Sequence, residues 1–453
     1  MSQNIVLKKG LNIPLKGEAA PCVSKTIAPG TIAIQPADFK GLLPRLLVKE
    51  GDAVLCGSPV LADKKNPDIL VTSPASGVVK EIVRGEKRKL LAVIIETDGE
   101  QNCVDFGAKS VETLDADAVR SAILAAGLWP LFVQRPYGII ADPEAAPRDI
   151  FVSAFDTAPL APCSEFCLGD RVKDIQTGIW AVAKLTAGSV HVSLPAKRSA
   201  VDPFGRLDGC TLHTFEGKHP AGNVGVQIAA IAPIRKGDTV WTISLLGLAA
   251  IGRLFNTGKL DLRRKVAVCG PMAIQASYID TIPGMPMSAI AGQWGTSACE
   301  ARVISGDVLS GKAVGPDGYL GWFDDQITII KEGTERELFG WIRPIRYKQF
   351  STDRCYFSWL MPWRKYDMDT NLHGGPRAFL MNDQYYAKVL PMDLYPLYLT
   401  KACLALDIDK MEKFGIYEVL PEDLALCEFV DPSKNNIQDI IAQGIDLMLK
   451  EMA

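Results

Sequence analysis

The sequence predicts a multidomain chain that combines mixed α/β units with an all-β unit. The chain has 453 residues, more than one ordinary hydrophobic core organises, and 48% of them are apolar against 22% charged. Short β-rich runs fill residues 1–100, whereas residues 101–255 alternate between helical and strand patterns. Together these observations predict domains at residues 1–100, 101–255, 256–330 and 331–453.

Charge and cysteine usage limit the possible partners and compartments. Lys and Arg (49) nearly balance Asp and Glu (52), so no global field would attract nucleic acid or an anionic membrane. The N-terminus lacks the apolar core of a signal peptide, and the longest apolar run, residues 240–252, is too short for a membrane span. We read that run as a buried strand leading into a helix. Eleven cysteines without a C-x-x-C pair indicate a reducing compartment, and we expect a cytoplasmic protein.

The first region contains two halves of a quasi-repeat, "VKEGDAVLCGSP" and "TSPASGVV". They are similar to the lipoyl and biotinyl carrier domains, which are flattened β-barrels. A carrier needs a lysine at the tip of the hairpin between the halves, but the modified position falls on Asn66, beside Lys64 and Lys65. The sequence therefore predicts a barrel without a modified lysine, used as a scaffold. The alternative is a swinging covalent arm on Lys64 or Lys65.

The second region reads as a Rossmann-like parallel sheet. "LDADAVRSAILAAG" predicts a helix with Asp115 as N-cap and Gly127 as its end. "RDIFVSAF" is nearly continuous in its apolar character, which is typical of a strand buried on both faces. A second helix, with Asp170 as N-cap and Gly188 as its end, and the strand "SVHVSL" follow. Strand and helix in this rhythm predict parallel pairing.

The last two regions differ in character. Residues 256–330 contain "KVAVCGPMA", "ARVISGDVLSG" and "QITII", short strands and turns that predict a small mixed α/β module. Residues 331–453 begin with an aromatic and basic segment, "FGWIRPIRYKQFSTDRCYFSWLMPWRKY". They end in "NNIQDIIAQGIDLMLKEM", whose isoleucines keep helical spacing.

Several motifs in matching order carry a family resemblance over essentially the whole chain: "LKKGLNIPLKG", "VKEGD", "TSPASGVV", "EARVISGDVLSG" and "GWFDDQITII". Together they resemble the A subunits of the sodium-translocating NADH:quinone oxidoreductases (Na⁺-NQR), respiratory complexes that couple electron transfer to Na⁺ export. The resemblance implies a soluble-ligand-binding β-grasp module at 256–330 and a helical domain at 331–453. It also implies a peripheral protein on the cytoplasmic side of the inner membrane, without a transmembrane helix.

The same resemblance implies the partners and cofactors. In that family the protein joins a six-subunit membrane complex, and a membrane-embedded flavin-bearing subunit is the expected main partner. The NADH, flavins (FAD, FMN, riboflavin), iron–sulfur centres, quinone and Na⁺ belong to other subunits, so no cofactor is expected on this chain. The alternatives are a subunit of an Rnf-type electron-transport complex, which has a similar architecture, or a non-catalytic scaffold that binds a ligand or carrier.

Two expected cofactor sites of such relatives look degenerate. Flavin-binding relatives carry a glycine-rich loop after the first helix, but here "AGLWPLFVQRPYG" places Pro130 and Phe132 near the glycine positions. After the next strand Asp156 stands alone where those relatives have several acidic groups. An iron–sulfur run would need four thiolates. This chain keeps Cys427 alone, while Pro421, Leu424 and Asp431 hold the other positions, and Cys163 and Cys167 have no second metal-binding pair.

Binding is the remaining role that the sequence suggests. No catalytic residue and no metal ligand is expected, and His191, His213 and His219 read as structural. The bulky loop offers flat rings and a guanidinium suited to a quinone, at Trp129, Phe132, Arg135 and Tyr137. The alternative is that this bulk only fills an ancestral flavin site.

The aromatic and basic segment is the candidate docking surface for a membrane partner. Its candidate residues are Trp341, Arg343, Arg346, Trp359, Trp363 and Arg364. The alternative is that these aromatics form the core of their own domain. Nucleic acid would use similar side chains, but the net charge of −3 and the lack of a nucleic-acid fold signature exclude it.

Overall fold

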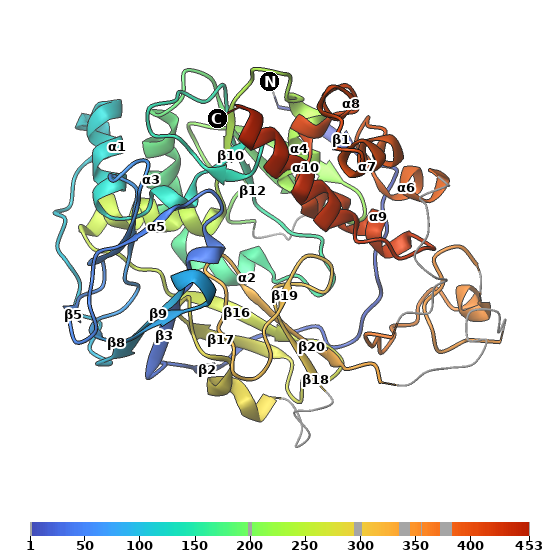
Figure 1. Cartoon of the computed structure of the whole chain (residues 1–453), viewed down its shortest axis with the longest axis horizontal. Coiled ribbons are helices and arrows are strands. Elements are labelled where there is room, and N and C mark those ends of the chain that lie inside the picture. The colour runs from blue at the N-terminus through green and yellow to red at the C-terminus, as the bar shows by residue number, and fades with distance from the viewer. Residues whose placement is uncertain are drawn as a thin grey trace.

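The parallel-sheet unit, residues 116–257, forms the centre of the computed structural model, which describes residues 2–197, 202–293, 301–334, 345–354, 356–371 and 383–452 (Figure 1). Its sheet runs, in spatial order, through β1 (Asn4–Val6), β14 (Thr211–Glu216), β13 (Val190–Pro195), β12 (Ile150–Ser153), β15 (Val240–Thr242), β10 (Val133–Arg135) and β11 (Ile139–Ile140). The first five strands are parallel, and β10 pairs antiparallel with β15. The expected parallel pairing is thus present in the centre of the sheet.

Each face of this sheet has its own apolar cover. Ile150 and Val152 of β12 belong to the cluster that includes the helices α1 (Ala116–Ala125), α3 (Val172–Ala183) and α5 (Leu245–Thr257). Phe151, which points to the other face, packs in a second cluster with α4 (Val224–Ile231) and the C-terminal helices. Because successive side chains of a strand alternate, a short apolar run such as β12 serves both cores.

Helices α3 and α5 approach each other closely because glycines face the contact. A Cβ atom on Gly178 would lie 2.2 Å from the carbonyl oxygen of Leu248, and one on Gly252 would lie 1.7 Å from that of Asp174.

The N-terminus of α3 differs from the expectation, since the helix begins at Val172 after a 3₁₀ turn, Gly169–Arg171. Asp170 is therefore not the cap, and its carboxylate instead lies 3.4 Å from Lys265 Nζ.

The barrel unit, residues 31–97, consists of two packed antiparallel sheets. One contains β3 (Thr31–Ile34), β9 (Leu90–Thr97), β8 (Gly77–Arg84) and β5 (Ala53–Val54), and the other β4 (Pro44–Leu46), β6 (Pro59–Asp63) and β7 (Leu70–Thr72). The candidate modification position, Asn66, lies with exposed Lys64 and Lys65 in the turn between β6 and β7.

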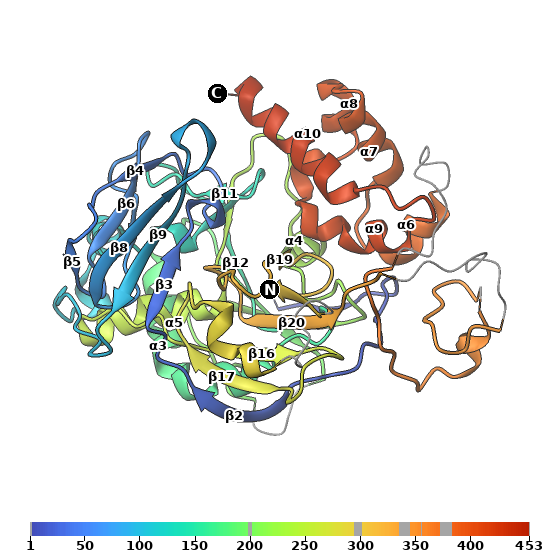
Figure 2. The ribbon, with the colours of Figure 1, turned by 60° about the horizontal axis from the view of Figure 1, so that its bottom comes forward.

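The third unit, residues 264–331, contains a mixed sheet whose edge strand comes from the N-terminal part of the chain. Its order is β19 (Lys312–Ala313), β18 (Ala301–Ser305), β20 (Gln326–Lys331), β16 (Arg264–Cys269), β17 (Ser277–Thr281) and β2 (Ala20–Thr26). Figure 2 shows β2 along the outer edge of this sheet, beside β17. The first two strands of the chain thus pair with the sheets of later units, although their place in the sequence predicts that they belong to the first β domain.

The helical unit, residues 383–452, packs on the parallel-sheet unit through α4 (Figure 2). It comprises α6 (Gln384–Val389), α7 (Pro396–Leu404), α8 (Ile408–Lys413), α9 (Ala425–Val430) and α10 (Ile437–Met452). The isoleucines at 437, 441 and 445 are buried, as the spacing predicted. Across the described ranges, no helix combines the length and apolar character that a bilayer span requires.

Candidate functional site

A polar cavity of about 190 Å³ lies where the parallel-sheet, third and helical units meet. It opens beyond the carboxyl ends of β12 and β14, the edge at which open α/β sheets bind ligands. Residues from all three units line it, notably Arg135, Asp156, His219, Asp307, Leu309 and Glu422. This combination of position and convergent polar groups makes the cavity the candidate ligand site.

His219 presents a hydrogen-bond donor to this cavity. The side chain is 4% exposed, and burial lowers its pKa to about 4, so the imidazole is neutral at pH 7. Its Nδ1 lies 3.2 Å from Thr157 Oγ1, which itself accepts from the Gly222 N–H at 2.9 Å. When the Thr157 hydroxyl donates to Nδ1, the ring hydrogen resides on Nε2, which has no partner among the described residues. An N–H without a protein partner at the wall of a cavity is a place for a ligand acceptor.

The acidic side chains of the cavity oppose anionic ligands. Asp156 is open to the cavity but closely surrounded by protein, and this desolvation, together with the charge of Asp307, raises its pKa. Asp307 accepts from the Leu309 N–H at 2.6 Å and from the Ser310 hydroxyl at 2.5 Å. With a neutral His219 and carboxylates on several sides, the cavity suits a neutral ligand better than a phosphate.

Arg135 borders the cavity, but its charge is already neutralised. Its Nη1 donates to Asp423 Oδ2 at 2.8 Å, and its Nη2 donates to Glu422 Oε1 at 3.0 Å. The side chains of Arg135 and Asp423 are 3% and 0% exposed. This ion pair joins the loop after α1 to the helical unit, and it fits against Gly225 of α4, where a Cβ would lie 2.2 Å from Asp423 Oδ2.

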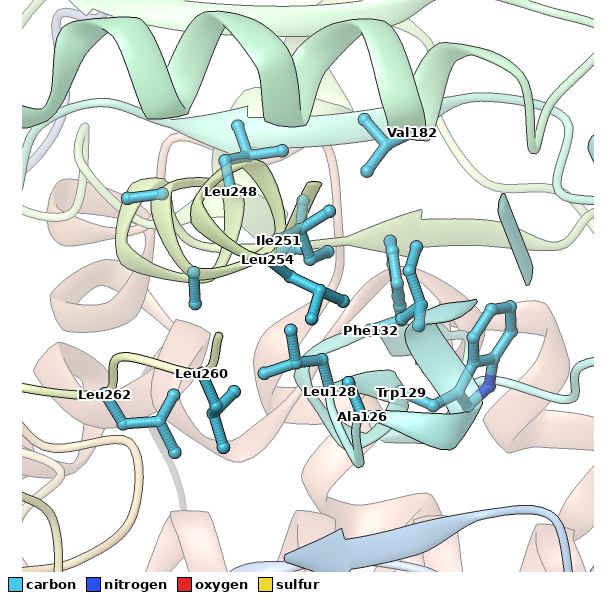
Figure 3. Close-up of a cluster of buried hydrophobic side chains, with 14 of the residues drawn as sticks. Ala126, Leu128, Trp129, Phe132, Val182, Leu248, Ile251, Leu254, Leu260 and Leu262 are labelled. Carbon is cyan, nitrogen blue, oxygen red and sulfur yellow. The ribbon is translucent and has the colours of Figure 1, made fainter. Parts of the chain in front are cut away.

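The other residues of the predicted quinone site lie in packed surroundings. Trp129 and Phe132 are 0% exposed and form a ring cluster with Trp241. Figure 3 shows both rings in one apolar cluster with Leu128 and with Leu254 of α5. The Trp129 Nε1–H donates to the Ala141 carbonyl at 2.8 Å. Tyr137 is half-buried against Tyr417, with 6.2 Å between ring centroids. Of the four predicted residues, Arg135 alone borders the cavity, and the positions of Trp129 and Phe132 favour the alternative that they fill space.

The loop after α1 does not fit a flavin phosphate. The residues from Trp129 to Leu131 form a 3₁₀ turn, and Pro130 has no N–H. The N–H groups of Leu128, Leu131 and Phe132 already donate to the carbonyls of Ile123, Leu128 and Trp129. These three N–H groups are therefore not available to a phosphate, and the buried rings of Trp129 and Phe132 leave it no space.

The cysteine positions singled out in the sequence are separate from the cavity. Cys427 is 1% exposed within α9, and burial raises the pKa of its thiol. Cys163 directly precedes α2 (Ser164–Leu168), to which Cys167 belongs, and burial raises the pKa of the Cys167 thiol to about 12. Within the ranges that the structure describes, no group of three or more His, Cys, Asp or Glu side chains could hold a metal ion.

The structure describes four of the six candidate docking residues. Trp341 and Arg343 lie outside the described residues. Trp359 and Trp363 are exposed, whereas Arg346 is buried and Arg364 is half-buried. Residues 345–371, apart from residue 355, form a lobe at one side of the molecule (Figure 2). The Lys388–Asp353 ion pair at 2.9 Å, the stacked rings of Phe350 and Phe429, and backbone hydrogen bonds between Tyr366 and residues 14 and 16 hold this lobe to the rest of the chain. Its exposed apolar side chains are Ile345, Tyr347, Phe357, Trp359, Leu360 and Trp363.

Most of the cavity was not found from the sequence. The sequence patterns point to Arg135, Asp156 and His219 without connecting them, and they give no indication of Asp307 or Glu422. The one available signal was position, because Asp156 follows a buried strand of a parallel sheet, where ligand-binding residues gather.

Comparisons with known proteins agree over nearly the whole chain. Residues 5–98 match the family described as the NqrA N-terminal barrel-sandwich hybrid domain, residues 114–260 the NqrA second alpha/beta domain, and residues 265–315 the NQRA C-terminal domain. The A subunit of the Na(+)-translocating NADH-quinone reductase of Rhodopirellula baltica is 36% identical, with 98% of each chain covered. That of Actinobacillus pleuropneumoniae serotype 5b is 35% identical over 99% of this chain and 100% of its own. A NAD⁺-reducing [NiFe]-hydrogenase structure aligns over half of this chain with a TM-score of 0.31 and 14% identity, too low to bear on the fold.

Proposed function

Because the chain belongs to the NqrA family, the A subunits of the Na⁺-translocating NADH-quinone reductases, we propose that it serves that complex as a peripheral docking protein with a quinone-accessible cavity. The full-length match to NqrA supports assembly with the other subunits. The resemblance to this family implies a location at the cytoplasmic face of the membrane, and family membership supports that location. In this proposal the redox cofactors belong to the partner subunits, and this chain contributes surfaces.

The exposed lobe at residues 345–371 is the proposed docking surface for the membrane-embedded partner. Trp363 is 79% exposed, and Trp359 is stacked under the guanidinium of Arg354 at 4.8 Å. Large exposed rings accompanied by arginine are what protein interfaces use as anchors, and basic residues suit the neighbourhood of anionic headgroups. Because Trp359 and Trp363 are exposed, a partner can cover both rings without displacing the contacts that hold the lobe to the body.

Co-purification tests this docking proposal. A tagged chain carrying Trp359→Ser and Trp363→Ser is expressed with the complex, and partner subunits are quantified from detergent-solubilised membranes. Loss of one interface anchor weakens binding by about 2 kcal/mol, roughly 30-fold, so partner recovery should fall by at least tenfold. The matched control carries Tyr395→Ser and Tyr398→Ser, two exposed rings of the helical unit, and should keep full recovery. Equal recovery with both variants, or loss with the tyrosine variant alone, overturns the proposal.

A neutral quinone head group fits the chemistry of the polar cavity. The His219 Nε2–H can donate to a quinone carbonyl, and Leu309 and Val224 offer apolar contact to the ring. Neighbouring carboxylates can accept hydrogen bonds from the reduced quinol but would repel an anion. The supporting observation is the neutral imidazole of His219, whose Nε2 has no partner among the described residues, in a cavity at the carboxyl ends of parallel strands.

Steady-state kinetics of the assembled complex tests this second part. His219→Phe keeps the ring volume but removes the donor, so the KM for a short-chain ubiquinone should rise about tenfold, corresponding to one hydrogen bond of about 1.4 kcal/mol. His213→Phe is the matched control, because His213 is equally buried but bonds His191 at 3.0 Å, away from the cavity. An unchanged KM in His219→Phe, with the complex intact, would remove quinone from this cavity and leave the docking proposal standing.

A further inference from the structure

A second cavity, of about 210 Å³, contains two neighbouring thiols. Cys56 follows β5 of the barrel unit, and Cys103 lies in the segment that leads from β9 to α1. The two residues form a parallel β-bridge, in which the Cys56 N–H donates to the Asn102 carbonyl and the Val104 N–H donates to the Cys56 carbonyl, both at 2.8 Å. Directly paired residues on neighbouring strands have their Cα atoms about 4.8 Å apart, within the range that a disulfide spans.

The two thiols also point to the same place. Both sulfurs lie near the carbonyl oxygen of Leu260, Cys56 Sγ at 3.6 Å and Cys103 Sγ at 3.8 Å, and Cys103 Sγ also lies 3.2 Å from the Gln101 carbonyl oxygen. Leu260 follows α5 and lies among the apolar side chains shown in Figure 3. Since both sulfurs converge on one oxygen from paired backbones, they are close neighbours, and the proximity of Cys103 contributes to a raised pKa of the Cys56 thiol, after burial.

The two cysteines differ in access. Cys56 is 2% exposed, whereas Cys103 is half-buried and borders the cavity. Arg253, Lys259, Asp261 and Arg263 lie around the opening. Arg263 is paired with Asp261 at 2.8 Å and Arg253 lies 3.8 Å from Asp174, so Lys259 is the cation at the opening without an ion pair among the described residues. Positive charge stabilises a thiolate and the oxyanion that leaves when a peroxide is attacked. An accessible thiol beside cations and next to a second, shielded thiol is the arrangement of an attacking and a resolving cysteine.

We propose that Cys56 and Cys103 form a reversible disulfide in response to hydroperoxides. The Cys103 thiolate attacks one oxygen of hydrogen peroxide, which breaks the O–O bond and, after protonation of the leaving hydroxide, yields a sulfenic acid and water. The Cys56 sulfur then attacks the Cys103 sulfur, and the hydroxyl leaves as a second water. Overall two thiols are oxidised to one disulfide, and hydrogen peroxide is reduced to two waters.

The disulfide would fix the barrel unit to the segment that connects it with the parallel-sheet unit. That segment already rests on the end of α5, where the Phe106 N–H donates to the Gly258 carbonyl at 2.8 Å and the Lys109 N–H to the Phe255 carbonyl at 2.9 Å. This inference is independent of the docking and quinone proposals.

Peptide mapping of the purified full chain tests the proposal. Trypsin should release Cys56 in peptide 50–64 and Cys103 in peptide 90–109, each with a single cysteine. After titration with hydrogen peroxide, non-reducing digests should contain these two peptides linked, with the mass of two hydrogens lost, and dithiothreitol should separate them. Linked peptide that stays absent while exposed Cys22 is oxidised overturns the proposal.

Variants separate the two roles. Cys56→Ser should leave a sulfenic acid on peptide 90–109 that dimedone traps, whereas Cys103→Ser should give neither the link nor the adduct. Cys163→Ser, a change at an exposed cysteine elsewhere, should behave as the unchanged chain does. Circular dichroism under reducing conditions confirms that each variant is folded. A dimedone adduct on peptide 50–64 in Cys103→Ser would contradict the assigned order of attack.

Discussion

Replacement of Arg135 by Met should destabilise the protein strongly, because the change leaves a buried carboxylate without its cation. The guanidinium and the Asp423 carboxylate are 3% and 0% exposed and are joined at 2.8 Å. In the variant, Asp423 keeps the Leu420 N–H at 3.0 Å as its remaining partner among the described residues, and its Oδ1 has none even in the unchanged chain. Removing one member of a buried ion pair costs about 3–5 kcal/mol.

Denaturant unfolding at pH 7, followed by tryptophan fluorescence, measures the change. Arg263→Met is the matched control, because Arg263 pairs with Asp261 at 2.8 Å but is 58% exposed, and its loss should cost less than about 1 kcal/mol. The double variant Arg135→Met with Asp423→Asn removes the stranded charge and should recover part of the loss. If Arg135→Met costs no more than Arg263→Met, the ion pair does not hold the helical unit in place.

Three further changes test the packing and the pH response. Gly225→Ala should lower stability although Ala favours helices by about 1 kcal/mol, because its Cβ would meet Asp423; Gly30→Ala, where the Cβ meets open space, should be neutral in thermal melts. Phe132→Ala should cost about 3–5 kcal/mol by leaving a cavity, against less than about 1 kcal/mol for exposed Phe323→Ala, in the same unfolding assay. The pKa of His219 is about 4 in the folded chain and about 6.5 unfolded, so the unfolded state takes up the proton first and stability falls as pH drops from 6.5 to 4. The loss approaches about 3 kcal/mol, at 1.36 kcal/mol for each pH unit. His219→Gln should therefore flatten the acid side of a stability–pH curve, and an unchanged slope would contradict the assignment.

Features governed by local sequence could be predicted. Asp115 caps α1 by accepting from the Ala118 N–H at 2.8 Å, and Gly127 follows the helix with φ of 69°. The strand β12, the strand and helix at residues 240–257 and the helix α10 also lie where their patterns indicated. In each case propensity, capping and burial pattern point to the same structure within a few residues.

Features that depend on distant partners could not be predicted. The strands β1 and β2 pair with β14 and β17, which would otherwise be edge strands of sheets formed by residues far along the chain. Nothing in the sequence around β1 and β2 indicates these partners. The pairing of Arg135 with Asp423 joins residues 288 positions apart. The cavity has the same origin, because its walls come from three units whose packing no local pattern specifies. Local patterns can also mislead: Asp170 is a favourable N-cap residue by type, but it lies within a 3₁₀ turn that precedes α3.

The loop after α1 explains why bulk replaces glycine there. At its start, a Cβ on Gly127 would lie 2.4 Å from Thr72 Cγ2 of the barrel unit, and the Thr72 hydroxyl donates to the Ala126 carbonyl at 3.1 Å. At its end, a Cβ on Gly138 would lie 2.8 Å from Leu420 Cδ1 of the helical unit. Between these contacts the rings fill the core and Arg135 reaches the cavity. The loop thus contacts the barrel unit at its start and the helical unit at its end, and the side chains between these contacts occupy the space that a phosphate-binding glycine loop would leave open.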